Sequence, residues 1–138
     1  GNYAFHNIKY TDPKLKYYLK KNGIEFINVN QGYTKCSTAI VNDKAILTSD
    51  VSIHKIAMQK GIDSIFIKPD NIELKGYNYG FIGGASGALS KKIFLITGKI
   101  KDKKIYKIIK KFVENNGYTI VQASEKNITD LGTIIPLM

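Results

Sequence analysis

Apolar residues along the chain follow two kinds of spacing, and each predicts a different secondary structure. Short alternating or continuous apolar runs are typical of strands, whereas apolar residues three and four positions apart form one face of a helix. Two helices of moderate length are predicted at residues 12–22 and from about Asp50 to Gly61. The longest follows Asp102, where lysines form the polar face and the apolar face consists of Ile105, Ile108, Ile109, Phe112 and Val113.

Each predicted helix has a start signal and a stop signal. Asp12, followed by Pro13, can accept the free N–H groups of the first turn, and so can Asp102 and either Asp50 or Ser52. A glycine able to adopt the left-handed conformation follows each helix, at Gly23, Gly61 and Gly117. Because a strand pattern begins directly after each glycine, we expect every helix to pack against its own sheet.

These elements form a repeat. A β-hairpin, a helix, a glycine and a strand occur in residues 35–68 and again in residues 84–123. An incomplete copy precedes them, with the helix 12–22, Gly23 and the strand 24–29. One such unit buries little apolar surface alone, so neighbouring units are expected to share a core.

The repeat predicts an α/β protein with a single domain over residues 1–138. In this prediction the domain consists of a partial first repeat (1–34), two complete ββαβ repeats (35–75 and 76–126) and a closing strand (127–138). In the first complete repeat the hairpin strands are placed at 36–41 and 45–48.

The composition restricts the possible partners. The net charge is +10, but all 21 basic residues are lysine. Without arginine, the usual reader of guanine edges and bidentate clamp for phosphate, we expect no specific nucleic-acid binding. Unspecific, salt-sensitive binding through lysines stays an alternative.

The chain has no apolar run of the roughly 18 residues that a membrane span needs, and residues 1–10 lack the pattern of a signal peptide. A single cysteine, Cys36, excludes an internal disulfide framework. Together these features favour a cytoplasmic protein.

Cys36 is the one thiol in the chain and the candidate nucleophile. Lys35 precedes it, and a nearby ammonium group favours the thiolate, which can attack a guanidino or amide carbon. The alternative is a small buried apolar side chain. His6 and His54 are the two imidazoles, interpreted as surface or helix-end residues, and their spacing does not indicate a zinc site. No cofactor is expected.

A glycine-rich segment, residues 76–87, is the second candidate. Its end, Gly83-Gly84-Ala85-Ser86-Gly87, can bind an anionic ligand with backbone amides. Within these five residues, Ser86 supplies the one side-chain hydroxyl and is the preferred polar contact. The segment lacks the Gly-Lys-Ser/Thr ending of a phosphate-binding loop. In the alternative interpretation, these glycines permit tight turns and a close approach of backbones.

The ββαβ repeat, with the segments 31–37, 76–87 and 130–137, resembles the α/β propeller of the guanidino-group-modifying enzymes, which include deiminases and amidinotransferases. The resemblance, to a bacterial branch of that fold, extends from about Gly23 onward. It implies a partial propeller, because the complete family fold has five units. The family's cysteine nucleophile lies near the C-terminus, whereas Cys36 lies in the first half of this chain.

The resemblance implies a small guanidino, amide or carboxylate ligand where Lys35, Cys36, Asp50 and Gly83–Gly87 converge. It also brings Asp130 toward the same axis, although Asp50 can instead cap a helix and Asp130 can bond its own turn. The leading hypothesis is therefore ligand binding without the usual catalytic triad. The alternative is a C–N hydrolase or amidinotransferase-like enzyme in which Cys36 attacks and Asp50 holds the substrate. An incomplete ring exposes strand edges, so we also expect a symmetric dimer.

Overall fold

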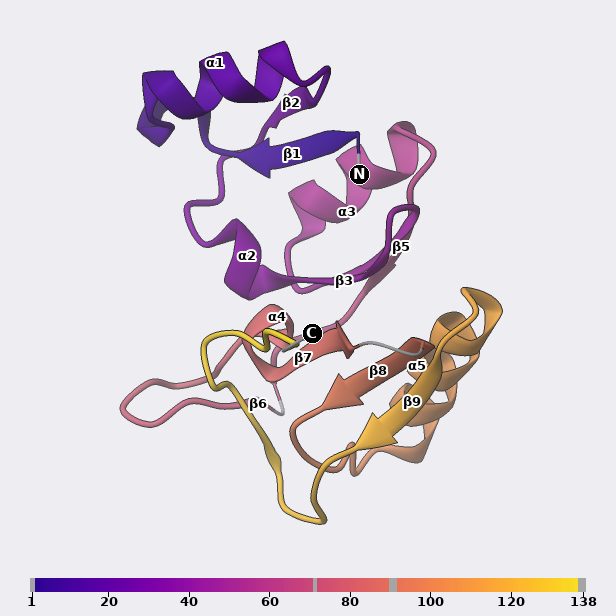
Figure 1. Ribbon diagram of the computed structural model, residues 1–138. Coiled ribbons are helices and arrows are strands. Elements are labelled where there is room, and N and C mark those ends of the chain that lie inside the picture. Colours follow the sequence, from indigo (N-terminus) through magenta and orange to yellow (C-terminus); the bar gives the residue numbers. More distant parts are fainter. Residues whose placement is uncertain (1, 71, 90–91, 137–138) are drawn as a thin grey trace.

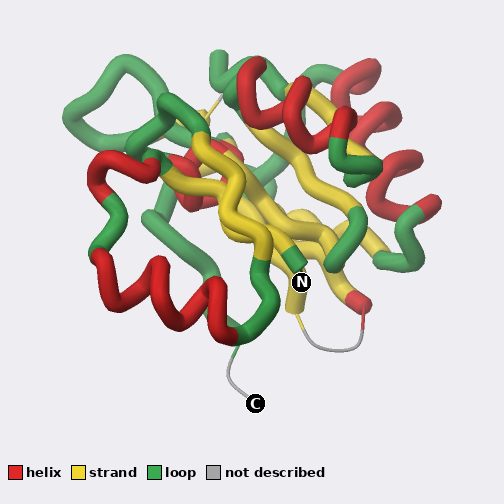
Figure 2. The backbone as a smooth tube through the Cα atoms, turned by 90° about the horizontal axis from the view of Figure 1, so that it is seen from above, coloured by secondary structure: helices red, strands yellow, loops and turns green. Residues whose placement is uncertain are grey.

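The computed structural model describes residues 2–70, 72–89 and 92–136 and shows a mixed α/β protein with several small sheets. Three units follow one another along the chain (Figure 1). Viewed from above, the strands gather in the middle and the longer helices lie at the periphery (Figure 2).

The first unit is a parallel strand pair with a helical crossover. It contains β1 (Tyr3–His6), the 3-10 helix η1 (Ile8–Tyr10), α1 (Pro13–Lys21) and β2 (Glu25–Asn28). Tyr3 lies opposite Glu25 in the parallel register. The helix and β2 were predicted, whereas β1 was not.

The middle unit contains α2 (Thr34–Ser37), β3 (Thr38–Asn42), β4 (Ala45–Thr48), α3 (Val51–Gln59) and β5 (Asp63–Phe66). Its sheet has the order β3-β4-β5, with β3 antiparallel and β5 parallel to β4. The predicted ββαβ connectivity is confirmed here. The expected strand at 36–41 is wrong at its start, because Cys36 lies in the helical turn α2.

The last unit repeats this plan. It contains β6 (Ile72–Glu73), α4 (Ile82–Ala85), β7 (Ser86–Leu89), β8 (Ile93–Ile96), α5 (Lys103–Asn115), β9 (Thr119–Gln122) and β10 (Ile128–Thr129). The sheet order is β7-β8-β9, and β6 pairs with β10 in parallel. The sequence also predicts a hairpin turn at Ser90-Lys91-Lys92; Ser90 and Lys91 lie outside the described residues, and Lys92 has a positive φ angle of 60°.

Equivalent hydrogen bonds show that the two complete units are true structural repeats. The N–H of Ser49 donates to the Ser37 carbonyl at 2.8 Å, and in the last unit the N–H of Thr97 donates to the Ala85 carbonyl at 2.9 Å. Each bond joins the end of the second strand to the helical turn before the first strand. The predicted closing strand at 127–138 is confirmed only at β10 and is wrong at residues 130–136, which form neither strand nor helix; residues 137 and 138 lie outside the described residues.

The predicted helix ends are confirmed. The carboxylates of Asp12, Asp50 and Asp102 accept backbone N–H groups in the first turns of α1, α3 and α5 at 2.7–2.9 Å. The three glycines that follow these helices have positive φ angles, at Gly23, Gly61 and Gly117. Such caps contribute on the order of 1 kcal/mol each.

Two apolar clusters hold the units together. The larger one joins the middle and last units and includes Leu47, Phe94 and Ile109. The smaller one joins the first and middle units and includes Val29 and Ile53. Burial of one large apolar side chain contributes about 1.5–3 kcal/mol, so the shared clusters explain how such small sheets remain folded. No helix in the described part of the chain is long and apolar enough to cross a membrane.

Candidate ligand-binding site

The helical turns α2 and α4 meet where the two complete units join (Figure 1). A Cβ atom on Gly83 of α4 would lie 2.2 Å from the Lys35 carbonyl oxygen and 2.7 Å from that of Cys36. The Lys35 ammonium group returns across the joint and donates to the Gly83 carbonyl at 3.1 Å. The structure therefore brings Lys35, Cys36 and Gly83 together, as expected, but as a tight contact between backbones.

Asp130 completes this joint from the other side. Its carboxylate is buried and accepts the N–H of Phe81 at 2.9 Å and that of Gly132 at 2.8 Å. A Cβ atom on Gly84 would lie 1.8 Å from the Asp130 Oδ1 atom. Asp130 thus bonds its own turn, as one of the two interpretations predicted, and also occupies the space beside Gly84.

Protein atoms also surround Ser86, whereas the surroundings of Gly87 are less tight. The Ser86 side chain is buried, and its hydroxyl donates to the Ile82 carbonyl at 2.7 Å. A Cβ on Gly87 would make contact with Ile134 at 3.4 Å. Close backbone approach, the alternative interpretation of these glycines, is confirmed at Gly83, whereas the atoms nearest Gly84 belong to the Asp130 side chain. Residues 83–87 line neither of the two cavities described below.

Cys36 and Asp50 lie on elements that are linked through the loop before α2. The Gln31 amide donates to the Asp50 carboxylate at 3.2 Å, and its oxygen accepts the N–H of Tyr33 at 2.9 Å. Cys36 is half-buried, and no described residue forms a hydrogen bond with its thiol. The loop holds Asp50 near the start of α2, but the described contacts of Asp50 are with Gln31, Ser52 and Ile53, not with Cys36.

Asp50 is a helix cap whose ionised form is stabilised. Partial burial opposes ionisation, but hydrogen bonds from the Ser52 hydroxyl, the Ile53 N–H and the Gln31 amide outweigh it. They hold the pKa of the Asp50 carboxyl below its ordinary value of 3.8. Asp50 is therefore an anion at neutral pH, and its hydrogen bonds account for its position without a ligand.

The two histidines have local structural partners. Nδ1 of His6 lies 3.1 Å from the Asn7 carbonyl oxygen, and Nδ1 of His54 lies 2.9 Å from the Ser64 hydroxyl. Among the described residues, no group of three or more histidine, cysteine, aspartate or glutamate side chains is arranged to hold a metal ion.

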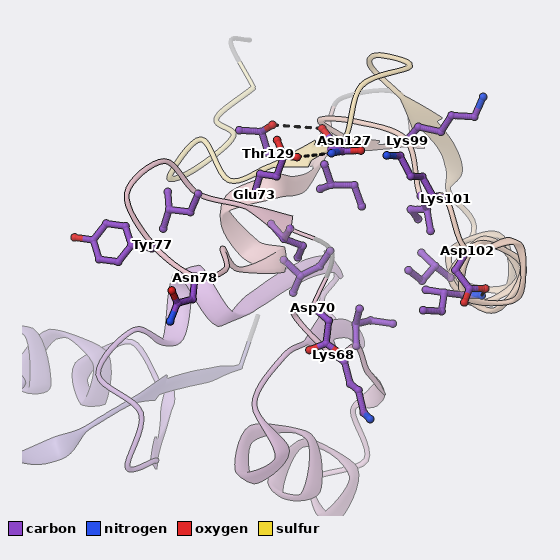
Figure 3. Close-up of a pocket in the computed structure, with 18 of the residues that line it drawn as sticks. Lys68, Asp70, Glu73, Tyr77, Asn78, Lys99, Lys101, Asp102, Asn127 and Thr129 are labelled. Carbon is purple, nitrogen blue, oxygen red and sulfur yellow. Dashed lines mark hydrogen bonds between the residues drawn. The ribbon is translucent and has the colours of Figure 1, made fainter.

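The larger of the two cavities is a cleft of about 470 Å³ beside the joint (Figure 3). We call it the β6–α5 cleft. It lies between the strand pair β6–β10, the segment 67–70 and the start of α5. Its floor is aliphatic and consists of Ile67, Ile72, Ile82, Ile100, Ile105, Ile109 and Ile128.

Charged side chains of both signs line the rim of the β6–α5 cleft. Four are lysines, Lys68, Lys75, Lys99 and Lys101, and three are acids, Asp70, Glu73 and Asp102. Three of these seven are already engaged: Lys99 pairs with Glu125, Glu73 accepts from Asn127, and Asp102 caps α5. Within the described part of the chain, the other four make no hydrogen bond or ion pair, so they are available to a ligand.

Sequence reasoning missed this cleft because its residues come from four separate segments between Ile67 and Thr129. One signal was present, in the charged residues Lys68 and Asp70 after a predicted strand and Lys101 and Asp102 before the longest predicted helix. Of these four, the sequence assigned a role to Asp102 alone, as a helix cap.

Among the comparisons with known proteins, only the comparison with protein families finds a match. Searches against curated proteins and against solved structures find no match for the chain. One family model matches residues 1–135, which is nearly the whole chain, and its description is a family of unknown function. The chain therefore belongs to that family, DUF6873.

Proposed function

We propose that the chain is a small-ligand-binding domain, built as a partial α/β propeller of the guanidino-group-modifying type, and that its ligand occupies the β6–α5 cleft. The observation that carries the proposal is the cleft itself, about 470 Å³ with an aliphatic floor and unengaged charges on its rim. Cavities of this size, mostly apolar with a few polar groups, are typical of small-molecule sites.

The repeat geometry supports the propeller part of the proposal. The first strands of the two complete units, β3 and β7, are in contact, and the helical turns before them meet at Gly83. Helices α3 and α5 pack on the outer strands of their units, β5 and β9. Repeated units whose inner strands face a common centre are what the resemblance to that fold implies.

The cleft favours a ligand with an aliphatic stem and charges of both signs. Lys68, Lys75 and Lys101 can bind a carboxylate, and Asp70 can bind a guanidinium or ammonium group. The isoleucine floor suits the methylene groups between them. The proposed class is therefore a zwitterion in which an aliphatic stem separates the carboxylate from a distal guanidino or amino group, within the guanidino, amide and carboxylate ligands implied by the resemblance. The site differs from the expected one, because protein atoms fill the space beside Gly83 and Gly84.

Three related compounds test this proposal. L-Arginine carries all the proposed features, agmatine lacks the carboxylate, and L-norleucine lacks the guanidino group. In an NMR titration we expect saturable shifts at the cleft residues with L-arginine, and at least tenfold weaker binding of the other two. An L-arginine titration that fails to saturate in the millimolar range, or equal binding of all three compounds, would contradict the proposal.

Two variants and one matched control locate the site. Lys101→Gln is expected to weaken the binding of L-arginine more than the binding of agmatine. Asp70→Asn is expected to weaken the binding of L-arginine more than the binding of L-norleucine. Lys107→Gln replaces an exposed lysine of α5 that does not line the cleft and should leave binding within twofold of wild type. If Lys107→Gln and Lys101→Gln have equal effects, the binding is general electrostatic attraction.

A Cys36-dependent hydrolase is the second candidate, favoured by the partial exposure of Cys36 near the loop that holds Asp50. The enzyme function predicts alkylation of Cys36 by iodoacetamide at neutral pH much faster than that of a free cysteine derivative. It also predicts that Cys36→Ser abolishes hydrolysis of guanidino compounds. Alkylation no faster than the reference would exclude an activated nucleophile.

A further inference from the structure

The first unit has an open strand edge. In each of the other two units, the equivalent edge is covered by a strand of that unit. Strand β1 leads through α1 into the parallel strand β2, as β4 leads through α3 into β5 and β8 leads through α5 into β9. Strand β1 is therefore the equivalent of β4 and β8. Those two strands each carry an antiparallel neighbour, β3 or β7, whereas β1 has only β2 among the described strands.

The backbone of β1 has hydrogen-bonding groups directed at this open edge. The carbonyls of Asn2 and His6 accept the N–H groups of Glu25 and Val29, so these alternate residues face β2. In a parallel pair, every second residue of a strand directs its backbone groups to the same side, so Ala4 also faces β2 and the residues that alternate with it face the opposite side. Tyr3 and Phe5 are thus the residues whose N–H and C=O groups are directed away from β2.

A groove of about 400 Å³ runs along the same edge. Residues 2–6 form one wall, and alternate residues of β3, namely Thr38, Ile40 and Asn42, form the other. The opposite face of β3, Ala39 and Val41, is buried in the cluster shared with the last unit, where β3 is in contact with β7. Ile40, in contrast, is 56% exposed.

The repeat explains this exposed isoleucine. In the complete units, one inner strand packs on the next, as β3 does on β7. An inner strand in the first unit would lie in the groove, pair with β1 and cover Ile40 on β3. The groove has room for one strand only, because β3 bounds it on the side opposite β1. Strand β1 of a second copy does not fit, because it would carry its partner β2 with it, and two paired strands are wider than the groove.

We propose that the open edge of β1 is a strand-addition site for one extended peptide, which binds antiparallel to β1 with apolar side chains at alternate positions. Main-chain hydrogen bonds to Tyr3 and Phe5 supply affinity, and contact with Ile40 selects apolar residues, as in other cases of β-augmentation. This site is separate from the β6–α5 cleft and does not depend on its ligand.

The first probe is a synthetic peptide that copies residues 37–43, the inner strand β3 with its flanks. Added to the full chain, it is expected to slow amide hydrogen exchange of Tyr3 and Phe5 at least tenfold, measured by NMR. The control peptide has proline in place of the residue corresponding to Ala39 and should lose this protection, because proline disrupts strand pairing. No slowing at millimolar peptide overturns the proposal.

A matched pair of variants locates the contact. Ile40→Glu is expected to weaken peptide binding at least tenfold. Ile108→Glu changes a residue on α5 that is also 56% exposed, and its peptide binding should stay within twofold of wild type. Equal weakening by both variants overturns the proposal. If Tyr3 and Phe5 are already protected in a dimer seen by sedimentation, a second copy occupies the edge, and the peptide site is refuted.

Discussion

Gly83→Ala is the most direct test of the joint between the two complete units. The added methyl group would lie 2.2, 2.4 and 2.7 Å from the carbonyl oxygens of Lys35, Thr38 and Cys36, where ordinary contact begins at 3.4 Å. All three atoms belong to backbone, so no side-chain rotation relieves the clash. The segments α2 and α4 must move apart for the variant to fold.

The expected cost follows from two opposing terms. Inserting a methyl into a closely packed site costs about 1–3 kcal/mol, and occasionally more. Alanine in place of glycine in a helical turn returns roughly 0.5–1 kcal/mol. Three backbone contacts place Gly83 at the upper end of the first range, near 3 kcal/mol, so after subtracting the second term we expect Gly83→Ala to lower the free energy of unfolding by about 2–2.5 kcal/mol.

Urea denaturation measures this difference. With a slope of about 1–3 kcal/mol/M, the midpoint should fall by roughly 0.7–2.5 M at an unchanged slope. Gly32→Ala is the matched control, because Gly32 has no positive φ and no atom lies within 4 Å of the position that its added methyl group would occupy; its effect should be within about 0.5 kcal/mol of zero. If the two midpoints agree within error, the joint is not closely packed and the reasoning is wrong.

Three further predictions concern other parts of the structure. Gly84→Ala should be strongly destabilising alone but much less so in an Asp130→Ala background, because all three nearest atoms belong to the Asp130 side chain; additive effects in a double-mutant cycle would contradict this. Asp50→Ala should cost about 1 kcal/mol at neutral pH. The pKa of Asp50 is lowered on folding, so this difference should be present above the ordinary value of 3.8 and shrink as the pH falls below it; a difference constant from pH 7 to 2 would refute it. Phe94→Ala should cost about 3–5 kcal/mol by thermal or urea unfolding, because the side chain is fully buried; a cost under about 1 kcal/mol would show that this core tolerates a cavity.

The elements that the sequence predicted well are those determined by neighbouring residues. The caps at Asp12 and Asp102 and the stop at Gly117 act within one turn of their helices. The apolar face of α5 is similarly local: its residues Ile109 and Val113 are buried as expected, whereas Ile108 at the edge of this face is 56% exposed. Such signals need no knowledge of the tertiary structure.

The errors occur where distant segments decide the conformation. Cys36 was expected in a strand, but α2 forms against Gly83, which is far away in sequence. Strand β1 is four residues long and is defined by its pairing with β2. The apolar tail after Thr129 was expected to be a strand, yet Leu131 and Ile135 are 67% and 73% exposed and no described strand pairs with them.

The candidate site shows the same division. The resemblance grouped Lys35, Cys36, Asp50, Gly83 and Asp130, and the structure brings these residues together except for Asp50, which caps α3. It could not show that carbonyl groups and a carboxylate fill the space between them. The open volume lies one layer away, in the β6–α5 cleft, and only the folded arrangement of the strand pair β6–β10 and α5 creates it.

The pairing of β6 with β10 has a consequence for how such a protein can grow. Ile72 and Ile128 are partners in this pair, so the two ends of the last unit lie side by side. A gene duplication that copies the segment between them would insert a whole unit whose entry and exit points already coincide. The neighbouring units would keep their places, which gives the architecture a simple evolutionary route from two complete repeats to a larger number.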